Sequence, residues 1–528
     1  MSKEHIIAVE KQIDQYFADN KLKELNFAQA VWTLLSAAED HHIKIQQIRP
    51  LPEVQRRAYT DLFLNCLSYS LRVCLNESKK LSIEIDNRLI EDHYRLAQKW
   101  LDASRDYYHF CSIFPLWHKG KIDLSIEENK LVATGWNTLA LEYEAYNRLI
   151  RKTGDRIETP FDLNEIAESV ISYSSISSGE FKVNFNPKLV RELVEFWERA
   201  SEGKYNLPND WQFTYFTVGQ FKSVFMTIQA MLVGWYAARV IFVSNGLEDL
   251  GYRSAVWVVS KKELENRLRR YTGMGKNIVC NVLRFITFGN ENIRDPDIAI
   301  QPLIDLGNEK YALSPFVWTN TDVERNLCVL LNLIDSGKAV YSQLVNDKEI
   351  LLRNELISAA NSLGYEYKFG RLKDTNVDLA LISREERACI ALELKWFIEP
   401  AEIREVIDRS KELKKGVAQA KRVDYYFKKN DTSLIKQILD IESDYNFLAV
   451  VGSKNWIGDF DVQDKEIPII KVGHLFKKIG ETSSISQVIK WLKERSYLPV
   501  RNKDFDVVSI DLSCGEWRAK WYGIKLIQ

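Results

Sequence analysis

Two acidic residues and a lysine stand at positions where their types and spacing could do chemistry. In the segment CIALELKWF (389–397), alternation with a period of two places Glu393 and Lys395 side by side on one face of a predicted strand, opposite an apolar face. Asp378 directly follows Val377 in the preceding strand-like run, and the turn SREERA joins the two runs as a hairpin. This hairpin predicts that Asp378 lies opposite Glu393.

Two carboxylates that converge from adjacent strands form a hard-oxygen site. Mg²⁺ and Mn²⁺ prefer carboxylate, carbonyl and water oxygens as ligands. A bound divalent cation lowers the pKa of water and stabilises the charge that develops on a pentavalent phosphate. A lysine two residues beyond one carboxylate can orient or deprotonate that water and offset the charge of the phosphate. The residues therefore predict metal-assisted hydrolysis of phosphodiesters.

These residues resemble the catalytic motif of the PD-(D/E)XK phosphodiesterases, which have the restriction-endonuclease fold. Val377-Asp378 stands at the motif aspartate, and Glu393-Leu394-Lys395 matches the E-x-K. The spacing of 15 residues between Asp378 and Glu393 suits a β-hairpin. The resemblance covers residues 345–475, about a quarter of the chain, and is similar to the nuclease domains of bacterial restriction and anti-phage defence proteins.

Two further residues match positions that this family uses, each with a solvent-facing helix residue as the alternative. Glu355, in the helix predicted before the first strand, stands where many members add a carboxylate to the metal site. Gln419 lies on the predicted crossover helix, where related nucleases carry a glutamine near the scissile phosphate. Val377 replaces the proline of the motif. Val423 stands where exonuclease-type members have a tyrosine, and Tyr426, on the same helical face as Gln419, is the possible substitute.

The resemblance implies a role for each matched residue. Lys395 would position the attacking water, and Gln419 would orient the substrate. The residues implied in catalysis are Asp378, Glu393, Lys395, Gln419 and Glu355. The groups implied in binding Mg²⁺ or Mn²⁺ are the carboxylates of Asp378, Glu393 and Glu355 and the backbone carbonyl of Leu394.

The elements that must position these residues read as an α/β domain over residues 345–528, with a mixed central sheet and further strands at the C-terminus. A helix over 348–363 is predicted to end at Gly364. Strand-like runs follow at 365–369, 377–382, 389–397, 447–452 and 467–472, with a long helix over 399–429 and another over 485–494. A meander, a crossover helix and further strands predict the mixed sheet.

The preceding residues read as mostly α-helical. Apolar residues at three- and four-residue steps predict a helical domain over 1–158 and a second, mostly helical region over 159–344 that senses, regulates or oligomerises. The apolar stretch from Phe225 to Val243 contains Gln229 and Arg239 and is typical of a buried helix in a soluble protein rather than of a membrane span.

Composition limits the classes of partner. The 72 basic and 73 acidic residues give a net charge of −1, so nucleic acid could be held only by a local basic patch. The helix predicted over 399–429 supplies such a patch through Lys414, Lys415, Lys421 and Arg422, with an ordinary solvated face as the alternative. The seven scattered cysteines and the N-terminus without an apolar signal core predict a cytoplasmic protein.

Other catalytic motifs are missing from the sequence. The segment TGMGKN (272–277) lacks the spacing of a P-loop, and no HExxH or GxSxG motif occurs. We therefore expect a cytoplasmic, Mg²⁺-dependent nuclease that cuts DNA in preference to RNA, forms a homo-oligomer and acts in restriction or anti-phage defence. A nuclease-like domain that binds nucleic acid or a partner without cutting is the alternative. A helical part that responds to an activating ligand or protein would meet the needs of a defence role.

Overall fold

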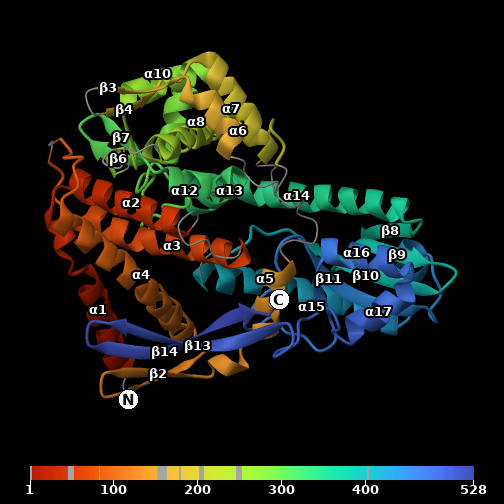
Figure 1. Cartoon of the computed structure of the whole chain (residues 1–528). Coiled ribbons are helices and arrows are strands. Elements are labelled where there is room, and N and C mark those ends of the chain that lie inside the picture. Colours follow the sequence, from red (N-terminus) through yellow and green to blue (C-terminus); the bar gives the residue numbers. More distant parts are fainter. Residues whose placement is uncertain are drawn as a thin grey trace.

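The computed structural model describes residues 3–45, 53–81, 84–150, 163–177, 180–200, 207–244, 252–400 and 403–527. The first third is a helical bundle with one hairpin attached (Figure 1). Its elements are α1 (Lys3–Ala18), η1 (Lys21–Glu24), α2 (Phe27–Ile43), α3 (Glu53–Glu77), α4 (Glu91–His118), β1 (Asp123–Glu127), β2 (Lys130–Thr134), η3 (Trp136–Thr138) and α5 (Leu141–Leu149). Gly135 has a φ of 88° and starts the short 3₁₀ turn η3, so α5 begins only at Leu141.

The second region is also mostly helical, as expected, with two small sheets. Its helices are α6 (Leu163–Ile171), α7 (Pro187–Ala200), α8 (Val218–Ser244), α10 (Lys261–Thr272), α11 (Lys276–Phe285), α12 (Pro315–Thr319) and α13 (Val323–Leu333). Its strands are β3 (Ser174–Ser177), β4 (Glu180–Val183), β5 (Trp257–Ser260), β6 (Ile304–Gly307) and β7 (Lys310–Leu313). Ser314 caps α12 through its side chain, and Pro315 starts the helix directly after β7 ends at Leu313.

The long apolar helix α8 is the centre of this second region. It is long and apolar enough to cross a membrane, yet 78% of its most apolar window is buried against other parts of the chain. The Gln229 side chain donates to the carbonyl oxygens of Trp318 and Thr321, and it accepts from Trp197. These bonds satisfy a buried amide inside the protein, so α8 has the packing of a core helix.

The C-terminal part is an α/β unit with a mixed five-stranded sheet, as expected. Its elements are α14 (Asp335–Ser362), β8 (Glu366–Arg371), β9 (Asn376–Ser383), β10 (Ala388–Lys395), α15 (Ile403–Lys428), η5 (Ser433–Leu439), β11 (Asn446–Ser453), β12 (Ile469–Lys471), α16 (Val472–Thr482) and α17 (Ile485–Lys493). The strand order is β12-β11-β10-β9-β8. The strands β8, β9 and β10 pair antiparallel, and β10, β11 and β12 pair parallel. The crossover helix α15 lies between β10 and β11 in the chain.

The structure differs in two features from the α/β domain expected over residues 345–528. The helix α14 begins at Asp335, so it reaches from the second helical region to the sheet and crosses the first boundary (Figure 1). The last strands, β13 (Phe505–Cys514) and β14 (Trp517–Leu526), form a separate sheet with the N-terminal hairpin, in the order β1-β2-β14-β13. Their apolar side chains pack with those of α1 and α4, so these strands belong structurally to the N-terminal part.

The boundary expected at 158/159 lies outside the described residues, but the two helical regions share a core. Trp32 of α2, Val256 before β5 and Phe316 of α12 belong to one buried cluster. The fully buried Glu39 of α2 accepts from the Ser314 hydroxyl and from the backbone N–H of Phe316. A buried carboxylate without hydrogen-bond donors would be costly. Because the donors to Glu39 come from the second region, these hydrogen bonds join the two regions.

Candidate active site

The β9–β10 hairpin places the two predicted carboxylates opposite each other. The strands pair with Leu392 opposite Leu379, and the next step of this antiparallel register sets Glu393 opposite Asp378. The backbone N–H of Leu394 donates to Asp378 Oδ2 at an N···O distance of 2.8 Å. The site therefore lies where β9 begins and β10 ends, at one end of the sheet.

Lys395 completes the predicted trio at the end of β10. Its Nζ lies 2.7 Å from Glu393 Oε1, and its side chain is 14% exposed. The crossover helix passes directly over this lysine at Gly416, where an added Cβ would lie 3.2 Å from Lys395 Cε. Gly416 thus gives Lys395 the room to turn toward Glu393.

Glu349 of α14 supplies a third carboxylate whose charge acts on the residues of the site. The backbone N–H of Trp396 hydrogen-bonds Glu349, whose charge also acts on both Glu393 and Lys395. Glu355, the residue expected here, instead forms an ion pair with Lys454 at 2.9 Å, with its own side chain 47% exposed. Six residues along a helix correspond to about 240° of rotation, so the two glutamates point in different directions.

The signal for Glu349 was present in the sequence. Leu352, Leu356 and Ala360 form the buried stripe of α14. Glu349 continues this stripe, whereas Glu355 lies about 100° away from its centre.

Burial and mutual repulsion disfavour the charged forms of these acids. Burial, with the charge of Asp378 adding to it and Lys395 opposing it, raises the pKa of Glu393 to about 7. Burial also raises the pKa of Asp378 and Glu349 above their ordinary values. Burial alone would lower the pKa of Lys395, but the charges of Glu393, Glu349 and Asp378 outweigh it and hold that pKa above its ordinary value. Lys395 is therefore a cation at neutral pH and acts as a donor.

The donor set is one that a hard divalent cation accepts. Glu393 is 4% exposed, and its Oε2 is buried without a hydrogen-bond partner. Such an orphaned oxygen beside a second carboxylate and a strand-end carbonyl fits Mg²⁺ or Mn²⁺. Within the described ranges, no three His, Cys, Asp or Glu side chains are grouped as a metal site. The fit thus rests on Asp378, Glu393 and the carbonyl of Leu394, with Glu355 outside the set.

Gln419 lies on the part of α15 that passes over the site. Gly416, three residues before it, contacts Lys395, and Arg422, three residues after it, donates to the backbone oxygen of Asp374 in the β8–β9 turn. Gln419 is half-buried between these two contacts. The hydroxyl of Tyr426 donates to Asp374 Oδ1 at 2.6 Å, so this residue anchors the β8–β9 turn.

The basic residues expected to hold nucleic acid are engaged within the protein. Lys414 pairs with Asp461 at 3.5 Å, Lys415 with Glu412 at 2.7 Å and Lys421 with Asp464 at 2.6 Å. Arg422 uses one nitrogen on the Asp374 carbonyl oxygen. This face of α15 therefore carries surface ion pairs. Two of the three acidic partners come from the loop after β11, so the sequence of α15 alone could not show them.

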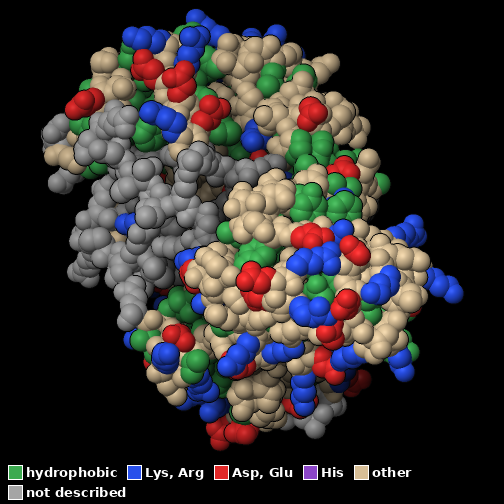
Figure 2. All heavy atoms as spheres, turned by 90° about the vertical axis from the view of Figure 1, so that its right-hand side faces the viewer, with side chains coloured by type: hydrophobic (Ala, Val, Ile, Leu, Met, Phe, Trp, Pro, Cys, Tyr) green, Lys and Arg blue, Asp and Glu red, His purple; other side chains and the backbone are tan. Residues whose placement is uncertain are grey.

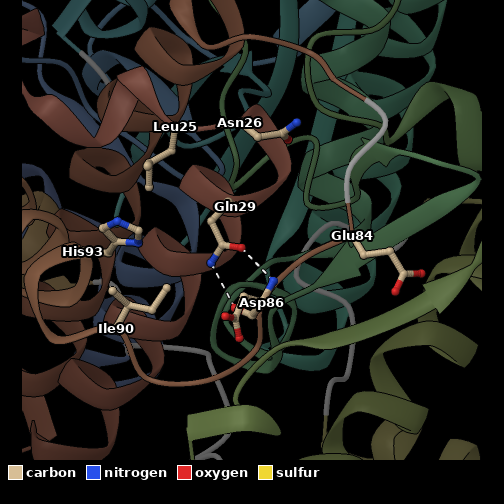
Figure 3. A pocket seen from close by; sticks show the side chains of 7 residues that line it. All are labelled: Leu25, Asn26, Gln29, Glu84, Asp86, Ile90 and His93. Carbon is tan, nitrogen blue, oxygen red and sulfur yellow. Dashed lines mark hydrogen bonds between the residues drawn. The ribbon is translucent and has the colours of Figure 1, made fainter.

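A well-defined hollow in the helical part has no catalytic grouping. It has a volume of about 280 Å³ and lies against α2, where Gln29 exchanges two hydrogen bonds with the backbone of Asp86 (Figure 3). Asn26 likewise donates to the carbonyl of Leu81. These polar groups hold the segment before α4 onto α2.

Comparison with known proteins assigns no relative. No protein-family model, no curated protein and no solved structure matches this chain.

Proposed function

We propose that this protein is a Mg²⁺-dependent nuclease that hydrolyses phosphodiester bonds, with DNA as the substrate. One observation carries the proposal: Asp378, Glu393 and Lys395 converge at one end of the sheet, and Glu349 joins them from α14. The order of helix, antiparallel meander, crossover helix and parallel strand supports the restriction-endonuclease-like fold that the resemblance implies. A role in restriction or anti-phage defence, with the helical part regulating or targeting the nuclease, belongs to the same proposal.

The protein's own groups divide the work of hydrolysis. When bound, Mg²⁺ supplies Lewis-acid activation of water and neutralises charge on the phosphate. Asp378, Glu393 and the carbonyl of Leu394 would hold it. Lys395, kept cationic by the surrounding acids, donates to the attacking water or to a phosphate oxygen. The Gln419 amide orients the phosphate from α15.

The two glutamates of α14 form a matched pair. Glu349→Gln should lower the cleavage rate by about 10- to 100-fold, because it removes a charge that acts on both Glu393 and Lys395. Glu355→Gln removes only the exposed ion pair with Lys454 and should leave the rate within about twofold. Single-turnover cleavage of a labelled oligonucleotide measures both. Equal losses in the two variants would remove Glu349 from the site.

Gly416 is a positioning residue whose substitution separates activity from stability. Gly416→Ala should lower the cleavage rate about tenfold, because the new methyl would crowd Lys395 Cε at 3.2 Å. Alanine favours a helix over glycine, so the midpoint of thermal unfolding should not fall. Ala418→Val, at an exposed position of α15, is the control for changes in the helix itself. A Gly416→Ala protein with the wild-type rate would show that Lys395 needs no such space.

A second candidate function, binding of nucleic acid without cleavage, is favoured by the closure of the site. Glu393 is 4% exposed, and Lys395 already pairs with one of its oxygens. A protein that binds nucleic acid equally in Mg²⁺ and in EDTA, and never cuts it, would fit this candidate.

The experiment that separates the two candidates is a substrate panel. The full chain and Lys395→Ala are incubated with supercoiled plasmid, linear duplex, single-stranded DNA and RNA in Mg²⁺, Mn²⁺ or EDTA. Cleavage that needs the metal and is lost in the variant supports the nuclease and identifies the substrate. Identical cleavage by both proteins would contradict the assignment of Lys395.

A further inference from the structure

An exposed aromatic ring lies on the edge strand beside the candidate active site. Phe369 of β8 is 48% exposed, and β8 is the last strand of its sheet. The register of β8 and β9 shifts between Lys368 and Gly370, so Phe369 alone stands opposite two residues of β9, Leu379 and Asp378. Phe369 is therefore an exposed apolar ring on the edge strand, at a register position opposite the candidate catalytic Asp378.

Arg353 connects this ring to the site. It lies one helical turn after Glu349 on α14, and its guanidinium carbon is 4.6 Å from the centre of the Phe369 ring. Its charge also lowers the pKa of Asp378, against the larger effect of burial. Its Nε is buried without a hydrogen-bond acceptor. One face of the ring is thus covered by a cation that can take an anionic partner, and much of the ring remains accessible.

The surface around this ring is better suited to a nucleic acid strand than α15 is. Arg371 and Lys373 follow Phe369 along the chain, are exposed and form no ion pair within the described ranges. By contrast, Lys414, Lys415 and Lys421 of α15 are each paired with an acid. On the face of the molecule shown in Figure 2, Lys and Arg side chains are interspersed with Asp and Glu.

We propose that Phe369, backed by Arg353, stacks on an unpaired base next to the scissile phosphate, so that the substrate is single-stranded where it is cut. The inference rests on the proposed function, which supplies the nucleic acid. A base that has left the duplex exposes its face to a surface aromatic ring, and stacking on that face tolerates any sequence. The Arg353 guanidinium then takes a phosphate of the same strand, and Arg371 and Lys373 continue the contact along the edge of β8.

Binding without cleavage tests the stacking. The full chain is titrated onto a fluorescein-labelled oligothymidylate and onto a duplex of equal length, in EDTA and again in Ca²⁺, and fluorescence anisotropy is recorded. Phe369→Leu should weaken binding of the single strand by about 5- to 150-fold and leave duplex binding nearly unchanged. Phe369→Trp should restore wild-type affinity, because its ring offers the same stacking face.

A matched aromatic residue provides the control. Tyr425 of α15 is 56% exposed and has Lys429 Nζ 5.8 Å from its ring centre, but it is not part of the site. Tyr425→Leu should bind the single strand as wild type does. Arg353→Gln should lower the slope of log affinity against log salt concentration by about 0.7, the loss of one phosphate contact on a single strand.

Each outcome decides the matter. Wild-type affinity in Phe369→Leu, an equal loss on both substrates, or no binding of the single strand by wild type would overturn the stacking. A wild-type protein that binds the single strand through Phe369 but cuts nothing in Mg²⁺ would contradict the nuclease and leave the base-binding site standing. Thermal unfolding of each variant separates a loss of binding from a loss of fold.

Discussion

Lys395→Met is expected to lower the rate of Mg²⁺-dependent cleavage by about 10²- to 10⁴-fold. The variant keeps the length and apolar stem of the side chain, but it removes the ammonium that lies 2.7 Å from Glu393. A positioned donor or proton-transfer group contributes about this much to a hydrolytic rate. Single-turnover cleavage under saturating protein measures the chemical step without the step of product release.

The control for this loss is another lysine at the end of a neighbouring strand. Lys454 follows β11, and its side chain pairs with Glu355 at 2.9 Å. Its backbone N–H donates to the carbonyl oxygen of Lys395, a hydrogen bond that a change of side chain leaves in place. Lys454→Met should cleave within about twofold of wild type. A Lys395→Met protein that cuts at the wild-type rate, or a Lys454→Met protein that is equally impaired, would refute the role given to Lys395.

Glu393→Gln should abolish cleavage and, without metal, make the protein more stable at pH 8. The folded protein raises the pKa of Glu393 from 4.5 to about 7. A raised folded-state pKa gives stability that is fully present below the unfolded value of 4.5 and is lost as the pH rises through about 7. This loss amounts to at most about 3 kcal/mol at pH 8. The glutamine side chain never ionises, so the variant should keep this stability at alkaline pH.

Denaturant unfolding in EDTA between pH 5 and pH 8 measures this difference. The free energy of unfolding of wild type should fall relative to that of Glu393→Gln across this range. Added Mg²⁺ should restore the stability of wild type at pH 8 and have little effect on the variant, because the cation requires the ionised carboxylate. Parallel stability curves for the two proteins would show that Glu393 carries no raised pKa.

The local part of the candidate site could be predicted from the sequence. Asp378, Glu393 and Lys395 lie on one hairpin, and period-two alternation with a short turn sets their relation. Glu349 was missed because the rotation of α14 about its axis depends on which apolar residues the sheet buries, although the stripe through Leu352 contains that information.

Contacts between distant segments were beyond the reach of the sequence. The pairing of Ala519 in β14 with Leu131 in β2 joins segments nearly 400 residues apart, and no local pattern specifies such a register. The ion pairs of Lys414 and Lys421 likewise depend on Asp461 and Asp464, in a loop that folds back beside α15. The three lysines of the predicted binding surface therefore have acidic partners in the structure, two of them from outside α15.

The long helix α14 gives the helical part a direct route to the site. It begins in the second region and carries Glu349 and Arg353 to the sheet. A fragment that starts at residue 345 would shorten this helix and would also separate β14 from β2. The proposed nuclease activity and its proposed regulation by the helical part should for this reason be tested in the full chain.

The central claim is that Asp378 and Glu393 hold a divalent cation, and anomalous diffraction from crystals grown with Mn²⁺ tests it most directly. The account predicts an anomalous peak about 2.1 Å from a carboxylate oxygen of each residue and from the carbonyl oxygen of Leu394. In crystals of Glu393→Gln the peak should be absent. A wild-type map without density there, or with Mn²⁺ bound elsewhere in the protein, would contradict the account.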